Sequence, residues 1–351
     1  AMLTVGQLFS ELLLEFLGTT DGIRRDALTY LRIILMGMPL VIVSSVLAAL
    51  IRADGNPRYA MLCVIPGCML NILLDWLFIF PLGWGITGAA WATVLGQMVN
   101  FCIATVYLPR FRMAELFRKG KRQLLDAAVR AVRLGSAGFI NQFAAVAYVI
   151  FVNRYLEIYG AGSAYGATIP LAVFGIMMKV SQISTCFLNG VAVGMQPLLG
   201  YHYGRKDYPR VKICLETAAF LATFLGISFF LIFELFPESI MALFGETDPL
   251  YMEYGVFCFR IFLLAIPIYG FSIVSTGLFQ AIGKPVQAGF MALSRQIIYF
   301  IPLAMYLAPR YGVVGMLWAS PIGDIFAFIT CLTLFLREWK RLGMERGRIG
   351  G

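Results

Sequence analysis

One pattern of residues occurs twice in this chain. Residues 32–57 align with residues 260–285 at a shift of 228, and both segments end in Gly-x-Pro. Shortening the shift to 227 aligns GITGAAWATVLG (85–96) with GVVGMLWASPIG (312–323), and LFSELLLEFLGTTD (8–21) with LFPESIMALFGETD (235–248). A duplication of this length predicts two structurally similar halves.

The amino-acid composition indicates whether these halves fold in water or in a membrane. The chain has 351 residues, of which 60% are hydrophobic and 13% charged, and its mean hydropathy is +0.81. This is the composition of a protein with many membrane spans. Runs long enough to cross a bilayer lie at about 28–51, 59–80, 85–108, 134–157, 164–199, 213–235, 253–280, 286–308 and 312–336. We therefore expect an all-α integral membrane protein with nine full spans.

The arrangement of the repeats predicts a two-lobe helical bundle. Equivalent spans are six helices apart, an even number, so the two copies share one orientation and are related by a pseudo-two-fold axis along the membrane normal. The second copy begins near Gln123, whose counterpart would lie roughly a hundred residues before Ala1. We expect an N-terminally truncated bundle in which residues 1–18 are the remnant of a further helix; a naturally shortened first half is the alternative.

Loop charges predict the orientation in the membrane. Segments 109–133, 201–212 and 337–351 hold eight, four and five Lys or Arg residues, whereas 81–84, 158–163 and 236–252 hold none. By the positive-inside rule the basic segments, and with them the C-terminus, are cytoplasmic in a multi-pass plasma-membrane protein. The net charge of +9 thus reflects topology, and we expect no nucleic-acid partner.

Residues for catalysis or metal binding are scarce. The seven cysteines form no CxxC pair, the single histidine, His202, lies in a basic loop, and there is no GxSxG motif. An intramembrane enzyme would need a nucleophile with a base, or metal ligands, inside the spans. We therefore expect no catalytic residues, no disulfides, no cofactor and no metal centre, apart from a possible sodium site described below.

Several motifs together resemble one transporter family. RADGNP (52–57), the Asn71 and Asp75 pair, GITGAAWAT (85–93), GVAVGMQPLLGYHYGRKDYPRVK (190–212) and FQAIGKP (279–285) are similar to the multidrug and toxic compound extrusion (MATE) family, in its bacterial multidrug branch. The resemblance implies twelve helices in two six-helix lobes that export cationic or amphipathic compounds in exchange for protons or sodium ions. This chain begins partway through the family's third helix.

The resemblance assigns each part of the chain to a lobe. Residues 1–108 would be the later part of the N-lobe, with the remnant of its third helix followed by its fourth to sixth helices. Residues 109–133 would be a basic cytoplasmic linker, in which 123–133 has the apolar spacing of an interfacial amphipathic helix. Residues 134–336 would be the C-lobe with helices seven to twelve, and 337–351 a basic cytoplasmic tail.

An acidic residue inside a span is a functional candidate because an intramembrane charge is costly. Gly67, Asn71 and Asp75 are spaced at i, i+4 and i+8, on one stripe of a helix. One interpretation is a site for a proton or a sodium ion, and the other is an Asp that only holds helices together. The resemblance implies a cation site made by Asn71, Asp75 and Thr93; the family's acidic partner on the first helix falls before Ala1.

Charged and amide residues in the second half are further candidates. Lys179, Arg295 and Asp324 lie near mid-span. Asp324 could simply neutralise Arg295 on the adjacent helix; alternatively Lys179 or Arg295 lines the second lobe's cavity and sets its field for substrate. Gln142 is either a packing residue or, as the resemblance suggests, part of the cavity wall.

Two aligned prolines, Pro39 and Pro267, lie inside predicted spans. Each removes a backbone hydrogen bond, so both are hinge candidates, although static curvature is equally compatible with the pattern.

The functional hypothesis is a cation-coupled antiporter that works by alternating access between two lobes. Its partners would be small cationic or amphipathic molecules and the lipid bilayer, its coupling ion H⁺ or Na⁺, and its oligomeric state monomeric. The alternatives are a flippase for a lipid-linked precursor, which would need a cationic cavity for a pyrophosphate, and a membrane scaffold that transports nothing.

Overall fold

The computed structural model describes residues 21–111, 121–163, 165–166, 168–244 and 248–349. The expected helix remnant at 1–18 lies outside these ranges. Within them every regular element is a helix, which confirms the all-α prediction. The helices group into two compact units that divide between residues 120 and 121, called unit 1 and unit 2 below and described separately.

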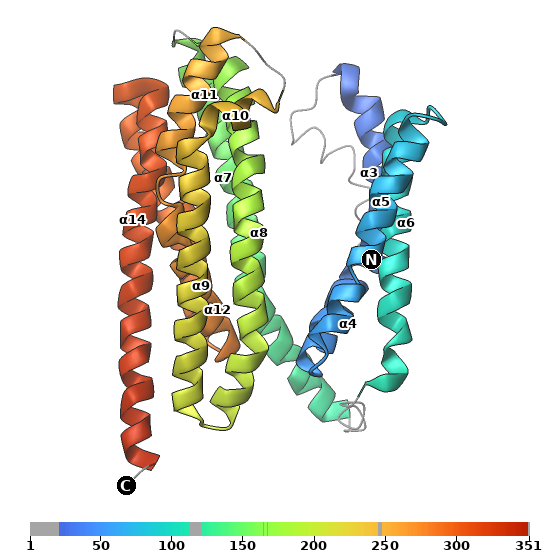
Figure 1. Ribbon diagram of the computed structural model, residues 1–351, viewed down its shortest axis with the longest axis vertical. Helices are drawn as coiled ribbons and strands as arrows, with labels where there is room; N and C mark the ends of the chain where they lie inside the picture. The colour runs from blue at the N-terminus through green and yellow to red at the C-terminus, as the bar shows by residue number, and fades with distance from the viewer. Residues whose placement is uncertain (1–20, 112–120, 164, 167, 245–247, 350–351) are drawn as a thin grey trace. The chain divides into compact units, whose positions relative to one another are not determined.

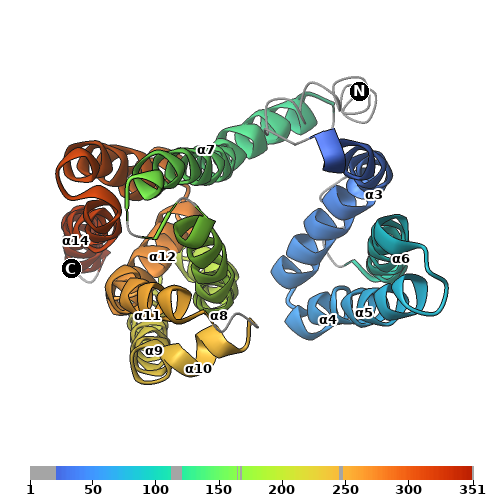
Figure 2. The ribbon, with the colours of Figure 1, turned by 90° about the horizontal axis from the view of Figure 1, so that it is seen from above.

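Unit 1 is built from three long helices and two short ones. These are α3 (Asp21–Ala53), α4 (Pro57–Leu62), α5 (Ile65–Ile79), α6 (Gly85–Val106) and the 3₁₀ turn η1 (Leu108–Arg110). Helix α6 packs against both α3 and α5 (Figures 1 and 2). Glycine makes the contact with α5 close, because a methyl group added to Gly96 would lie 2.6 Å from the carbonyl oxygen of Gly67. Such small residues let membrane helices approach backbone to backbone.

Unit 2 contains the rest of the described chain. Its elements are α7 (Lys121–Ala161), α8 (Thr168–Gly204), α9 (Tyr208–Leu235), α10 (Pro237–Ala242), α11 (Pro249–Phe262), α12 (Ile266–Ala281), α13 (Pro285–Leu293), the π-helix η3 (Ser294–Phe300) and α14 (Ile301–Ile349). Helix α12 packs against α8, α9 and α14. A core of buried apolar side chains, including the fully buried Met177, Tyr254 and Phe259, joins α7, α8, α11 and α14.

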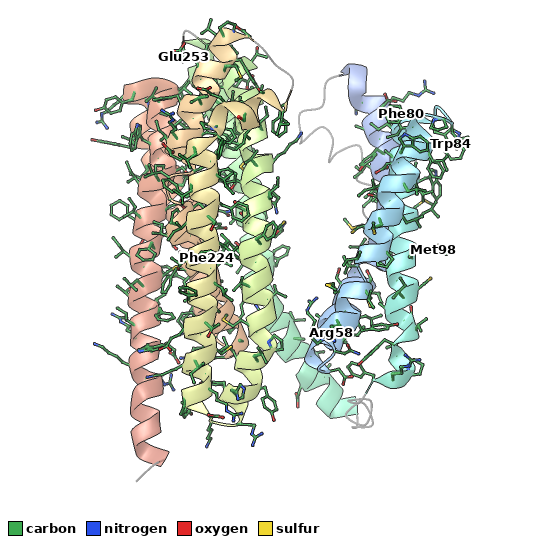
Figure 3. The ribbon with its side chains drawn as sticks, viewed as in Figure 1. Arg58, Phe80, Trp84, Met98, Phe224 and Glu253 are labelled. Carbon is green, nitrogen blue, oxygen red and sulfur yellow. The ribbon has the colours of Figure 1, made fainter. Side chains whose placement is uncertain are left out.

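The membrane spans agree with the sequence prediction. Seven described helices are long and apolar enough to cross a bilayer, and the broken pair α11 and α12 makes an eighth. The last of them, Pro285–Arg341, is divided at Gly312, whose φ of 60° and ψ of −141° are not helical; dividing it there yields the nine predicted spans. On the outer faces Met98 and Phe224 are 51% and 59% exposed and point away from their helices (Figure 3), as lipid-facing side chains do.

The duplicated motifs adopt the same backbone conformation. Gly55 and its repeat partner Gly283 have φ of 88° and 75°, and Gly85 and its partner Gly312 have φ of 53° and 60°. Left-handed backbone is open to glycine without steric strain. The first pair ends α3 and α12, and the second begins the last span of each copy. The sequence repeat is therefore a structural repeat at its turns.

Residues 123–133 are helical, and they form the beginning of α7, which continues from Lys121 through the first span of unit 2 without a break. The two aligned prolines occupy different positions in their helices. Helix α3 continues across Pro39, whereas α11 and α12 meet at a bend of 48° and Pro267 stands in the first turn of α12.

Candidate functional site

In unit 1, the predicted cation-site residues gather where α5 faces α6. The side-chain amide of Asn71 donates to the hydroxyl oxygen of Thr93 at 3.4 Å, and the Thr93 hydroxyl donates to the carbonyl of Ala89 at 3.0 Å. The close approach at Gly67 and Gly96 makes this contact possible, since a methyl group on Gly96 would also lie 3.1 Å from Cβ of Asn71. Asn71 and Thr93 were assigned from separate spans, and the fold brings them together.

Asp75 lies one helical turn beyond Asn71 on α5. Its side chain is partly buried, and its Oδ1 atom is fully buried with no hydrogen-bond partner in the described part of the chain. A buried polar atom without a partner is destabilising. The carboxylate of Asp75, the side-chain carbonyl of Asn71 and the hydroxyl of Thr93 all offer oxygen atoms as ligands. Oxygen ligands suit a hard cation, and a carboxylate can also take up a proton. No cluster of three His, Cys, Asp or Glu side chains is found among the residues searched.

Unit 2 contains a separate cavity of about 420 Å³, lined by both polar and apolar side chains. Side chains from α7, α8, α12, η3 and α14 form its wall. The wall is rich in amides, which include Gln142, Gln182, Asn189, Gln196, Gln280 and Gln296. Two of these amides join α8 to α12, because the Gln196 side chain donates a hydrogen bond to Oε1 of Gln280 at 2.9 Å. Cavities of this size accommodate drug-sized ligands.

Arg295 and Asp324 form an ion pair in this wall. Nε of Arg295 donates to Oδ1 of Asp324 at 2.6 Å, and the two side chains are 28% and 10% exposed. The guanidinium also lies 3.8 Å from the centroid of the Tyr269 ring. Arg295 and Asp324 are thus paired with each other and both line the cavity.

Lys179 occupies a different place from Arg295. It lies on α8 with an exposed side chain and is absent from the residues that line the unit 2 cavity. Of the two cations proposed for this wall, the structure puts only Arg295 in it.

Comparison with known proteins decides the family. A family model described as MatE matches residues 1–77 and 145–306, more than half of the chain. The chain belongs to the MatE family. This confirms the resemblance inferred from the motifs, and with it a membrane transporter rather than an enzyme.

Relatives of this MatE protein are distant in sequence. "Multidrug export protein MepA" of Staphylococcus haemolyticus (strain JCSC1435) is 23% identical over 321 residues, which cover 91% of this chain and 69% of that protein. The protein of the same name from Staphylococcus aureus (strain bovine RF122 / ET3-1) is 22% identical over 362 residues, with coverages of 97% and 74%.

Solved structures agree in fold. The "outward-facing conformation of a multidrug resistance MATE family transporter of the MOP superfamily" superposes with a TM-score of 0.86 at 20% identity, covering 99% of this chain and 76% of that one. A structure described as "reverse polarity of binding pocket suggests different function of a MOP superfamily transporter from Pyrococcus furiosus Vc1 (DSM3638)" gives 0.85 at 20% identity, with coverages of 98% and 76%. At these identities the likeness establishes the fold alone.

Sequence reasoning overlooked most of the cavity wall in this MatE protein. Tyr148 and Tyr269 line it, but aromatic residues are ordinary in membrane helices. The amides of α8 and α12 did carry a signal, because an uncharged polar side chain inside an apolar run needs a partner or water. Gln182, Gln196 and Gln280 could have been found by that rule.

Proposed function

We propose that this MatE-family protein is a secondary active exporter that exchanges a proton or a sodium ion for a cationic or amphipathic small molecule. The observation that supports it is the buried Oδ1 of Asp75, which has no hydrogen-bond partner among the described residues, beside the contact between Asn71 and Thr93. A bound proton or Na⁺ would give this oxygen the partner that it lacks. The names of the relatives, which are multidrug export proteins, support the substrate class.

Coupling in this proposal is a difference in affinity between two conformations. The ion binds more tightly to one arrangement of the two lobes and the substrate to the other, so each drives the other's release on opposite sides of the membrane. Asp75 carries the charge that the ion neutralises, while the oxygens of Asn71 and Thr93 complete the site. Lys179 stays a candidate for contact with the substrate, because an exposed cation near mid-span is costly against lipid.

Transport in vesicles tests this proposal. The full chain is reconstituted with a fluorescent cationic dye, and a proton gradient or a sodium gradient is imposed separately. We expect one of the two gradients to accelerate dye transport, and Asp75→Asn to reduce that acceleration to the level of empty vesicles. Asn71→Ala and Thr93→Val should retain part of it.

Glu157→Gln is the matched control, because Glu157 is an exposed acid whose ion-pair partner, Arg154, lies one helical turn away. It should transport as well as the parent. Gradient-driven transport that survives in Asp75→Asn would remove Asp75 from the coupling mechanism.

The cavity charges favour an exporter over a lipid-precursor flippase. A pyrophosphate group would require excess positive charge. Arg295 is the only Lys or Arg among the residues lining the unit 2 cavity, and Asp324 balances it. We also propose, from the loop charges, that the C-terminus is cytoplasmic. We propose further that the protein works as a monomer in the plasma membrane.

A further inference from the structure

The ion pair in unit 2 leaves some of the hydrogen-bonding atoms of both side chains without a partner in the described structure. Arg295 bonds to Asp324 through Nε alone. Within the described structure its two terminal nitrogens make no hydrogen bond, and neither does Oδ2 of Asp324; yet none of these atoms is among the buried unpaired ones. The pair therefore presents free donors and a free acceptor, side by side, to the cavity that both residues line.

We propose that this cavity is a second binding site, which takes a small molecule with an α-amino-carboxylate group. The ligand's carboxylate would bind the terminal nitrogens of Arg295, and its ammonium would bind Oδ2 of Asp324. This goes beyond the proposed exporter function, because the site lies wholly in unit 2 and uses none of Asn71, Asp75 and Thr93.

The charge balance selects this ligand class. A simple cation that approaches Asp324 is repelled by Arg295, and a simple anion that approaches Arg295 is repelled by Asp324. A neutral molecule leaves charged groups without the charge-assisted hydrogen bonds that they would make in water. A zwitterion satisfies both partners and adds no net charge. Because Arg295 and Asp324 are in direct contact at 2.6 Å, the two charges of the ligand must also be neighbours, as they are on one α-carbon.

The surroundings hold the guanidinium in place. The Tyr269 ring lies 3.8 Å from it, and stacking of this kind stabilises an arginine. Arg295 stands on the π-helix η3, a wide turn that is frequently found at functional sites. The cavity volume of about 420 Å³ leaves room for a side chain on the ligand, which the amides of the wall would contact.

Three closely matched probes test the ligand class. L-phenylalanine carries both charges, its methyl ester carries only the ammonium, and 3-phenylpropanoate carries only the carboxylate. Binding of each to the full chain in lipid nanodiscs is measured by equilibrium dialysis at mildly acidic pH, where the amine of the ester is protonated and the carboxylates of the other two probes are ionised. We expect phenylalanine to bind at least about tenfold more tightly than either probe, since one charged hydrogen bond accounts for such a factor.

Variants then assign the preference to the pair. Arg295→Gln should abolish the preference for phenylalanine over the ester, and Asp324→Asn the preference over 3-phenylpropanoate. Arg295→Lys keeps the charge but lacks the two-pronged geometry, so it should lose part of the affinity. Arg260→Gln, which changes an exposed arginine at the end of α11, is the matched control and should bind like the parent.

Three results would overturn the proposal: equal binding of phenylalanine and its ester, no binding of phenylalanine at millimolar concentration, or an unchanged preference in Arg295→Gln. The first two need no variant, so a variant that fails to fold leaves the proposal testable. Asp75→Asn should bind phenylalanine normally. A failure of ion coupling and a failure of this site are therefore distinguishable.

Discussion

The two copies of the repeat share a backbone but differ in chemistry where their last two spans meet. Helices α3 to α6 of the first copy correspond to α11 to α14 of the second, and matching left-handed glycines mark the turns in both. At a shift of 228 Gly67 aligns with Arg295, and at 227 Gln97 aligns with Asp324. Glycine and an amide thus stand where the second copy has an ion pair.

This difference separates two ways of using one helix contact. In the first copy the missing side chain lets the backbones approach, and Oδ1 of Asp75 is buried without a hydrogen-bond partner among the described residues. In the second copy Asp324 is already paired with Arg295. Under the proposed function the first contact takes up a cation, while in the second contact Arg295 already supplies one.

The largest expected effect is on the ion pair. Asp324→Asn should lower the free energy of unfolding by about 3 kcal/mol, because a largely buried arginine then loses its counter-charge. Unfolding in mixed micelles of increasing denaturing-detergent content measures this. Gln97→Ala, at the aligned position of the first copy, removes no charge partner and should cost far less. Equal losses of stability in the two variants would mean that the ion pair stabilises the protein no more than the Gln97 side chain does.

Helix spacing gives the next largest effect. Gly96→Ala should destabilise the protein by about 2 kcal/mol, because its new methyl group would overlap the Gly67 carbonyl. Gly323→Ala, the aligned change, should lie within about 0.5 kcal/mol of the parent, since the nearest atom is 3.4 Å away. The same detergent titration measures both. If Gly323→Ala proved the more harmful, the tighter contact would belong to the second copy.

The aligned prolines should respond differently. Pro39→Ala restores a hydrogen bond inside the continuous helix α3 and should raise thermal stability by about 1 kcal/mol. Pro267→Ala should have little effect, because the first turn of a helix lacks those bonds anyway. Thermal unfolding followed by circular dichroism measures both. Slower dye transport by Pro39→Ala at unchanged dye affinity would identify Pro39 as a hinge. Equal stabilisation by both substitutions would contradict the expected difference between Pro39 and Pro267.

An effect of similar size concerns the turn that follows the left-handed glycine. Asn56 caps α4 by accepting a hydrogen bond from the Tyr59 amide at 3.2 Å, whereas the aligned Lys284 makes no cap and pairs with Glu338. Asn56→Ala should cost about 1 kcal/mol, and Asn56→Ser, which can still cap, should cost little. Thermal unfolding of the three proteins checks this. Equal losses in the Ala and Ser variants would show that the cap is not what stabilises this turn.

Local rules were enough to predict much of this protein from its sequence. Hydropathy identified the spans because a membrane helix must be apolar over its whole length. The repeat aligned Gly55 with Gly283, and both adopt left-handed backbone, which glycine accepts without strain. Motifs then led to the family, and adjacent spans suggested that Arg295 and Asp324 would meet.

Tertiary structure alone decided which polar groups share a site. Whether Asn71 reaches Thr93, and whether Lys179 or Arg295 enters a cavity wall, depends on how each helix is rotated about its own axis. Packing across several neighbouring helices sets that rotation, through contacts such as Gly67 against Gly96. In an apolar span most faces look alike in sequence, because lipid and protein interior accept the same side chains. The cavity of unit 2 therefore became visible only once its helices were packed.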